Sequence, residues 1–170
     1  MPASAAWFAR VGLPLAPGER AEIGELLLGS HLLAHAESDN VESWAEASAI
    51  LRAADRDGSW WDDEEAERER LWICAADRLG ERALSNELTG IVDALIQPIR
   101  DSAGHAVTRA GLADSSLTGA ASGAALLAAQ QSALACFAGE GGTHFFARKF
   151  ALFTIGRWPL GLYLGRYIVF

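Results

Sequence analysis

Two histidines in the stretch HLLAH are the residues whose spacing best suits metal chemistry. His31 and His35 are four positions apart, so on a helix they share one face and could both ligate a transition metal. Two ligands do not complete a site, and the sequence has neither an HExxH motif nor the ExxH pairs of a di-iron bundle. His105 and His144 would have to complete the set. We therefore expect no cofactor, and keep a metal-binding protein or helical enzyme built on His31 and His35 as an alternative.

The stretch WWDDEEAERER places four consecutive carboxylates after two tryptophans. Clustered acids can bind divalent cations, but these acids fall in the first turn of a predicted helix, where the helix dipole favours negative charge. Arg68 and Arg70 follow at the three- or four-residue spacing that allows ion pairs with Glu64 and Glu67. No second aspartate-rich motif follows, so the cluster indicates a helix start rather than a magnesium site.

Tryptophan is unusually frequent, with six residues against two tyrosines. Neighbours on a helix point about 100° apart, so Trp60 and Trp61 cannot both face the core. Either one of them stays partly exposed beside the carboxylates, or Trp60 packs back before the helix start. An exposed tryptophan among acids suits a basic protein partner. The predicted partner-binding surface consists of Trp60, Trp61, Asp62, Asp63, Glu64 and Glu65.

The charge balance limits the classes of partner. The chain has 170 residues and a formal net charge of -8. Nucleic acids and anionic membranes require a basic surface, so we expect neither as a partner. Cys74 and Cys136 have no metal-ligand spacing and are expected to be buried free thiols. The start of the chain lacks the basic and apolar regions of a signal peptide. Both observations favour the cytoplasm.

The longest uncharged stretch, SSLTGAASGAALLAAQQSALACFAG, is long enough to cross a membrane. It consists mostly of Ala, Gly and Ser and contains two glutamines, which favours a buried helix of a soluble protein. Gly119 and Gly123 form a GxxxG pattern, which is typical of close helix–helix packing. A structural homodimer, formed through this helix or through a strand edge, is therefore a second alternative.

Caps and helix breakers predict six helices. Pro98 should kink or end the fourth, and the segment DSAGHAVTRAGLADSS after it should be mostly loop. The predicted helices run from Glu19 to Glu37, from a cap at Asp39 to the DRDG turn, from Ser59 to Gly80, from about Leu84 to Ile99, from a cap at Ser115 or Ser116 to the AGEGG turn, and from a cap at Thr143 to the glycines near the C-terminus.

The last segment, GRWPLGLYLGRYIVF, cannot continue a helix because it contains a proline and several glycines. It predicts two short strands, 157–162 and 166–170, joined by a turn near Leu164 and Gly165. A lone hairpin is marginal in water, so it should pack on the helices as a lid.

These patterns predict a mainly α fold: an irregular bundle of five to six helices with a short C-terminal β-hairpin. One domain of residues 1–170 is expected, with an N-terminal arm (1–18), a helical bundle (19–155) and a hairpin lid (156–170). No complete catalytic set is present, which argues against an enzyme without excluding one. We expect a small, acidic, cytoplasmic protein of the inhibitor or immunity type, which neutralises a basic toxin or enzyme.

Overall fold

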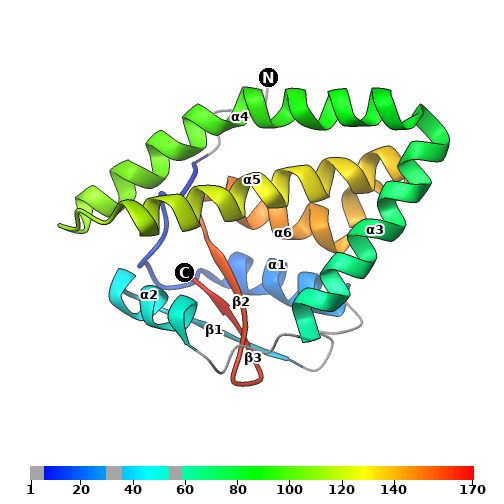
Figure 1. Ribbon diagram of the computed structural model, residues 1–170. Helices are drawn as coiled ribbons and strands as arrows, with labels where there is room; N and C mark the ends of the chain where they lie inside the picture. Colours follow the sequence, from blue (N-terminus) through cyan, green and yellow to red (C-terminus); the bar gives the residue numbers. More distant parts are fainter. Residues whose placement is uncertain (1–5, 30–35, 54–58) are drawn as a thin grey trace.

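The computed structural model describes residues 6–29, 36–53 and 59–170, and within these ranges it is mainly helical (Figure 1). The predicted fold class, a helical bundle with a short C-terminal β-hairpin, is confirmed. The helices are α1 (Pro17–Leu28), α2 (Trp44–Arg52), α3 (Ser59–Leu79), α4 (Glu81–Arg109), α5 (Ser115–Ala138) and α6 (Phe145–Thr154), and the strands are β1 (Glu37–Asn40), β2 (Pro159–Tyr163) and β3 (Arg166–Val169).

The alanine-rich helix α5 lies at the centre of the helical part and packs against α3, α4 and α6 (Figure 1). Ala121, Ala125 and Ala128 are fully buried, and their small side chains allow the neighbouring helices to approach closely. The GxxxG glycines do not serve this purpose. Gly119 and Gly123 lie on an exposed face, and a Cβ built at either meets no described atom within 4 Å apart from its flanking residues and the backbone of α5.

In the described part of the chain, α5 alone has the length and hydropathy of a membrane-spanning helix. Its most apolar window is 44% buried inside the protein. A core helix of a soluble protein meets the same criteria, so this single helix is weak evidence for a membrane location.

Helix α4 is longer than the sequence pattern predicts. It continues through Pro98 to Arg109, so the loop predicted from Asp101 onward is wrong. Figure 1 shows the helix changing direction along its length, as a proline inside a helix requires. Burial of apolar side chains beyond the proline, which offsets the lost hydrogen bond, extends the helix. These side chains are Ile99, Ala103, Ala106 and Val107.

Three helix starts differ from the prediction. Ser43, not Asp39, caps α2, and its hydroxyl accepts from the backbone N–H of Glu46. Asp114, one residue before the predicted serine, caps α5. His144, not Thr143, caps α6. In each case the capping side chain accepts from a free backbone N–H of the first turn. Residue spacing alone does not show which of several nearby polar residues will do so.

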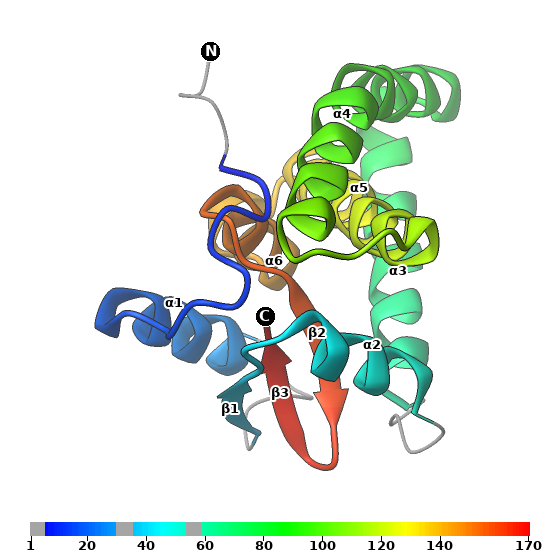
Figure 2. The same cartoon turned by 90° about the vertical axis from the view of Figure 1, so that its left-hand side faces the viewer.

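The C-terminal hairpin forms as predicted and gains a third strand. Leu164 and Gly165 both have positive φ, as a two-residue type I′ turn requires. β1 pairs parallel with β3, so the sheet order is β1-β3-β2. The predicted first helix therefore does not reach Glu37: α1 ends at Leu28, and residues 37–40 are a strand. Figure 2 shows α1 and α2 on opposite sides of this sheet.

Alternate residues of the last strand face two different apolar clusters. Tyr167 and Val169 pack with α1, α3 and the C-terminal half of α5. Ile168 and Phe170 pack with α2, the C-terminal half of α4 and the N-terminal half of α5. Because side chains alternate along a strand, β3 connects the two halves of the core. The main chain of Phe170 exchanges two hydrogen bonds with Trp158, at 2.7 and 2.8 Å, so the last residue is docked.

A buried arginine fixes the segment before α1 to the start of the hairpin. The Arg157 guanidinium is fully buried and donates to both carboxylate oxygens of Glu19, each at 2.9 Å. It also donates to the carbonyl oxygens of Arg10, Leu13 and Pro14. A planar guanidinium that finds acceptors in several directions needs no water, so this ion pair is stable in the core.

Candidate functional site

The first turn of α3 separates its two tryptophans. Trp60 is 3% exposed and its ring packs edge-to-face against Tyr167. Trp61 is 40% exposed. Gly161 makes room for Trp60, because a Cβ at that position would lie 2.6 Å from the indole ring. The prediction that one tryptophan stays partly exposed is therefore met by Trp61, while Trp60 belongs to the core.

One turn later, Glu64 forms a buried ion pair with α6. Its Oε1 lies 2.6 Å from Nζ of Lys149, and the two side chains are only 4% and 7% exposed. The ammonium also lies 5.0 Å from the centre of the Trp60 ring, within the range of a cation–π interaction. Burial lowers the pKa of Lys149, and the charge of Glu64 opposes that shift.

Three polar atoms around this pair are buried and have no hydrogen-bond partner among the described residues. They are the second carboxylate oxygen of Glu64, the Tyr167 hydroxyl and the Trp60 indole nitrogen. Burial raises the pKa of Tyr167 well above its ordinary value, and the nearby charge of Glu64 adds to the shift. Buried polar groups without partners cost free energy of folding, so these three atoms could form hydrogen bonds with a bound molecule or an ordered water.

Lys149 and both tryptophans line a cleft of about 250 Å³. Its lining residues come from α2, α3, α5, α6 and β2, together with Trp158 just before β2. The cleft is mainly apolar, and Lys149 is its one charged lining residue among those described. The other lining residues are Leu51, Trp60, Trp61, Ala120, Gly123, Ala124, Leu127, Phe153, Trp158, Pro159 and Leu160. A mainly apolar cleft with a single polar group is a common form of binding site.

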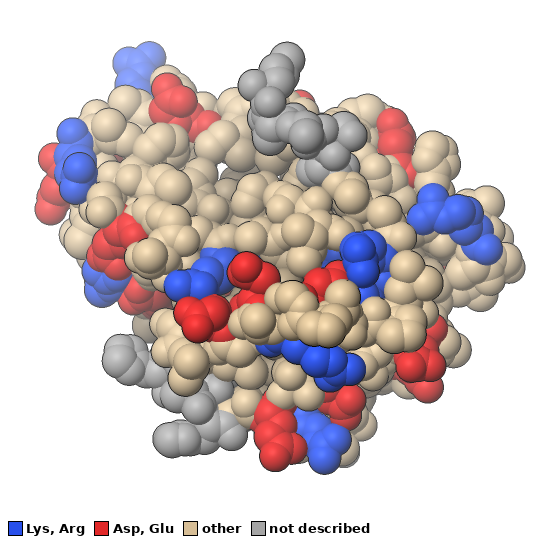
Figure 3. Space-filling model, turned by 180° about the vertical axis from the view of Figure 1, so that it is seen from behind, with Lys and Arg blue, Asp and Glu red and all other residues tan. Residues whose placement is uncertain are grey.

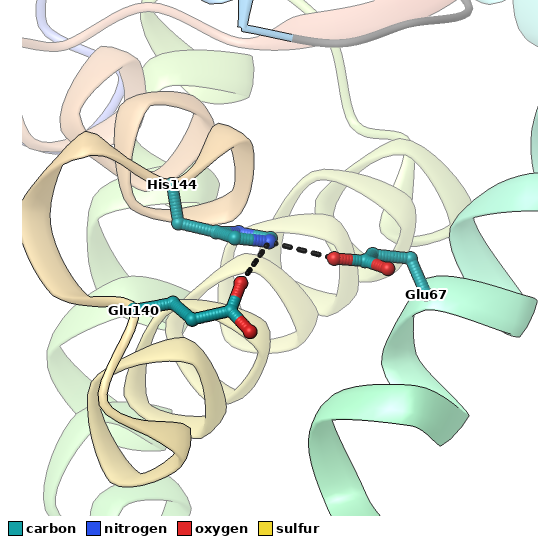
Figure 4. Close-up of side chains that lie close together, drawn as sticks. All are labelled: Glu67, Glu140 and His144. Atoms are coloured by element: carbon teal, nitrogen blue, oxygen red, sulfur yellow. Dashed lines mark hydrogen bonds and ion pairs between the residues drawn. The ribbon is translucent and has the colours of Figure 1, made fainter. Parts of the chain in front are cut away.

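A second polar cluster lies one turn further along α3. Glu67 and Glu140 approach His144 at 2.9 and 3.8 Å, and Figure 4 shows the three side chains converging from α3, the end of α5 and the start of α6. Their ligand atoms lie within 4.8 Å of one another, close enough to hold a metal ion. Arg70, however, donates paired hydrogen bonds to both carboxylates, at 2.7 to 2.8 Å.

Arg70 determines the chemistry of this second cluster. Its hydrogen bonds are the main reason that the pKa values of Glu67 and Glu140 are lowered, and those carboxylates in turn raise the pKa of Arg70. The guanidinium thus occupies the charge-balancing role that a cation would have. Nδ1 of His144 accepts from the backbone N–H of Phe146, so its Nε2 carries the proton and donates to Glu67. The cluster therefore ties α3 to the start of α6.

The predicted partner-binding surface is only partly at the surface. Trp61, Asp62, Asp63 and Glu65 are exposed, and Glu65 is paired with Arg68. Trp60 and Glu64 are buried, which corrects their place in that surface. A helix turns each successive side chain by about 100°, so Trp60 and Glu64 share the inward face that the sequence stretch obscures. The acidic surface is therefore confined to Trp61, Asp62 and Asp63, together with the paired Glu65.

Of the other predicted site residues, the structure describes His105 and His144 but not His31 and His35. His31 and His35 lie outside the described residues, so the metal alternative stays a prediction. His105 is exposed on α4, and His144 is in the charge cluster with Arg70. Cys74 is half-buried and Cys136 is exposed, which corrects the prediction that both thiols are buried. Because Cys136 is exposed, the thiols no longer support the cytoplasmic location as buried thiols would, and that location stays an expectation from the sequence.

Sequence reasoning missed Lys149, the charged residue among the described residues that line the cleft. One signal was available, because Lys149 is the only lysine in the sequence and every other cationic side chain is an arginine. Its partner Glu64 is 85 residues away, so no local pattern connects the two. Comparison with protein-family models, with curated proteins and with solved structures finds no match to this chain.

Proposed function

We propose that the chain is a small protein-binding protein of the inhibitor or immunity type, acting in the cytoplasm on a basic protein partner. The supporting observation is the position of Trp61, which is 40% exposed and lines the cleft. The partner would place one apolar side chain in the cleft and its lysines or arginines beside the acidic start of α3.

Trp61 and the cleft have the features of a binding hot spot. Hot spots are enriched in tryptophan and lie next to pockets that exclude water. The cleft is large enough for a leucine, methionine or aromatic side chain, and Leu127 adds a second apolar side chain that is 37% exposed. A partner that covers Trp61 and Leu127 would remove both from water.

The charges beside Trp61 favour a basic partner. Asp62 and Asp63 are exposed and form no ion pair with any residue in the described ranges. The formal net charge of -8 supports electrostatic attraction over longer distances. On the face that Figure 3 shows, acidic and basic side chains are interspersed without a continuous acidic patch.

The experiment is a pull-down of tagged protein from the lysate of its own host at low and high salt. Alongside the wild type, Trp61→Ala removes the anchor and Asp62→Asn/Asp63→Asn removes two charges. The double variant Asp77→Asn/Asp93→Asn removes the same charge from exposed positions on α3 and α4 and serves as its matched control.

The proposal predicts one stoichiometric basic protein that is bound by the wild type and the Asp77/Asp93 control. It should be lost at high salt and with Trp61→Ala, and weakened with Asp62→Asn/Asp63→Asn. A partner held equally by all four proteins would place the contact elsewhere. No partner under any condition, with a stoichiometric transition metal in the purified protein, would favour His31 and His35 instead.

A further inference from the structure

The only lysine of the sequence is placed on the wall of an apolar cleft. All other cationic side chains are arginines, most of them on the surface. Arginine would supply the same positive charge to Glu64, and its guanidinium is not deprotonated in proteins. A primary amine differs from a guanidinium in one chemical respect, which is that its neutral form is a nucleophile.

The surroundings of Lys149 favour the neutral amine more than water does. Lys149 is 5% exposed and burial lowers its pKa, although the charge of Glu64 and the Trp60 ring both favour the ammonium. Its ammonium can donate three hydrogen bonds and, within the described chain, donates one, to Glu64. The other two N–H groups have no partner among the described residues, and Lys149 lines the cleft, so a ligand bound there can approach the amine.

We propose that Lys149 forms a reversible imine with a small, apolar aldehyde or ketone that binds in this cleft. The lining offers apolar contacts to the body of such a molecule, and it offers no charge other than Lys149 in the described residues. A volume of about 250 Å³ accommodates a single substituted ring or a short aliphatic chain. The ligand is therefore an uncharged carbonyl compound rather than a carboxylate or a phosphate.

Glu64 supplies the proton transfers that imine formation needs. It takes one proton from the Lys149 ammonium, across the 2.6 Å contact, to give a neutral amine and a carboxylic acid. The nitrogen then bonds to the carbonyl carbon, and a second nitrogen proton moves to the oxygen as the carbinolamine forms. Glu64 returns its proton to the carbinolamine hydroxyl, which leaves as water. The product is a protonated imine that remains paired with the Glu64 carboxylate, and no oxidant or reductant is consumed.

This inference does not depend on the proposed protein partner. It concerns the chain alone, so its test contains no second protein. A failure of imine formation would leave the Trp61 surface untouched, and a failure of the pull-down would leave the reactivity of Lys149 untouched.

The experiment uses untagged full-length protein with benzaldehyde and sodium cyanoborohydride at pH 7. The reductant converts an imine into a stable benzylamine, which peptide mass spectrometry locates. The protein has two kinds of amine, the Lys149 side chain and the N-terminal α-amino group, and the latter is an internal reference. The same reaction in concentrated urea shows the intrinsic reactivity of both amines in the unfolded chain.

The expected result is that the ratio of Lys149 labelling to α-amino labelling is at least about tenfold higher in the folded protein than in urea. An ordinary lysine has a pKa of about 10.4 against about 7.7–8.0 for an α-amino group, so unfolding should reverse the preference. Folded protein in which the α-amino group is labelled and Lys149 is protected would overturn the proposal. This comparison needs no variant.

Two variants at exposed glycines of α5 test whether the cleft is the route to the amine. Gly123 lines the cleft and Gly119 does not, and a Cβ at either position meets no atom of the described chain within 4 Å. Gly123→Leu should reduce Lys149 labelling at least about fivefold, and Gly119→Leu should leave it unchanged. Equal labelling in both variants would show that the aldehyde reaches Lys149 by another path. In Lys149→Arg, the α-amino group should be the only amine that is labelled.

Discussion

Oε1 of Glu64 and Nζ of Lys149 lie 2.6 Å apart in the interior of the protein and join α3 to α6. Glu67 and His144, one turn along the same helix, form a second such link at 2.9 Å. Both links run from one face of α3 to the first half of α6. The first of them borders the cleft, so the residues that hold α3 in place also shape the candidate binding site.

Removing one member of the buried Glu64–Lys149 pair should lower the free energy of unfolding much more than replacing both members with apolar residues. Glu64→Gln leaves the Lys149 charge buried without a counter-ion, and should lower the free energy of unfolding by about 3–5 kcal/mol. The double variant Glu64→Leu/Lys149→Met replaces both charges with apolar groups and should recover most of that loss. Urea denaturation of the wild type, the single variant and the double variant measures both effects. A double variant as unstable as the single one would contradict this interpretation of the pair.

Trp60 should tolerate no side chain at position 161, because its ring occupies the space that a Cβ would need. Gly161→Ala introduces a Cβ 2.6 Å from the indole ring at a backbone φ of 98°. Gly165→Ala introduces comparable backbone strain at a φ of 75°, with no atom of the described residues within 4 Å. Gly161→Ala should therefore be more destabilising than Gly165→Ala by about 1–3 kcal/mol, the usual cost of overpacking. Thermal unfolding measures the stability of both variants. Equal losses of stability would show that the close contact with Trp60 does not restrict position 161.

The protein should lose stability in acid through Glu19. Its hydrogen bonds with Arg157 are the main cause of its lowered pKa in the folded state. A group of this kind adds stability above its unfolded pKa, near 4.5, and that stability disappears as the pH falls through the lower folded value. Urea midpoints should therefore fall between pH 5 and pH 3. Glu19→Gln should flatten this part of the profile, and the exposed Glu22→Gln should not.

The cluster of Glu67, Glu140 and His144 should not bind zinc while Arg70 is present. Added zinc is expected to leave the melting temperature of the wild type unchanged, and Arg70→Ala should allow a zinc-dependent increase. Differential scanning fluorimetry with a chelator control measures both. A wild-type increase that disappears in His31→Ala/His35→Ala would instead support the metal alternative at those histidines.

Local signals in the sequence account for the elements that were predicted correctly. Helix α3 begins at Ser59 and stops before Gly80, and the hairpin turns at Leu164 and Gly165. Each of these limits depends on the conformational preference of a few adjacent residues. β1 was not predicted because its four residues, ESDN, are polar and become a strand only by pairing with β3. Helix α4 likewise passes Pro98 because of distant packing partners.

The candidate site was predicted only in part, because some of its features depend on local geometry and others on distant residues. The contrast between Trp60 and Trp61 follows from helix geometry and was available from sequence. The burial of Glu64 was not, because its partner Lys149 lies on another helix. Long-range ion pairs have no local pattern, so the cleft emerges only from the tertiary structure.

The most direct test of the cleft as the functional site repeats the host-lysate pull-down with Gly123→Leu and Gly119→Leu. Both variants add the same side chain to an exposed position of α5, and only Gly123 lines the cleft among this pair. The account predicts that Gly119→Leu retains the basic partner of the wild type and that Gly123→Leu loses at least about 90% of it, roughly the 1.4 kcal/mol that a tenfold change represents. Equal retention of the partner by both variants would contradict it.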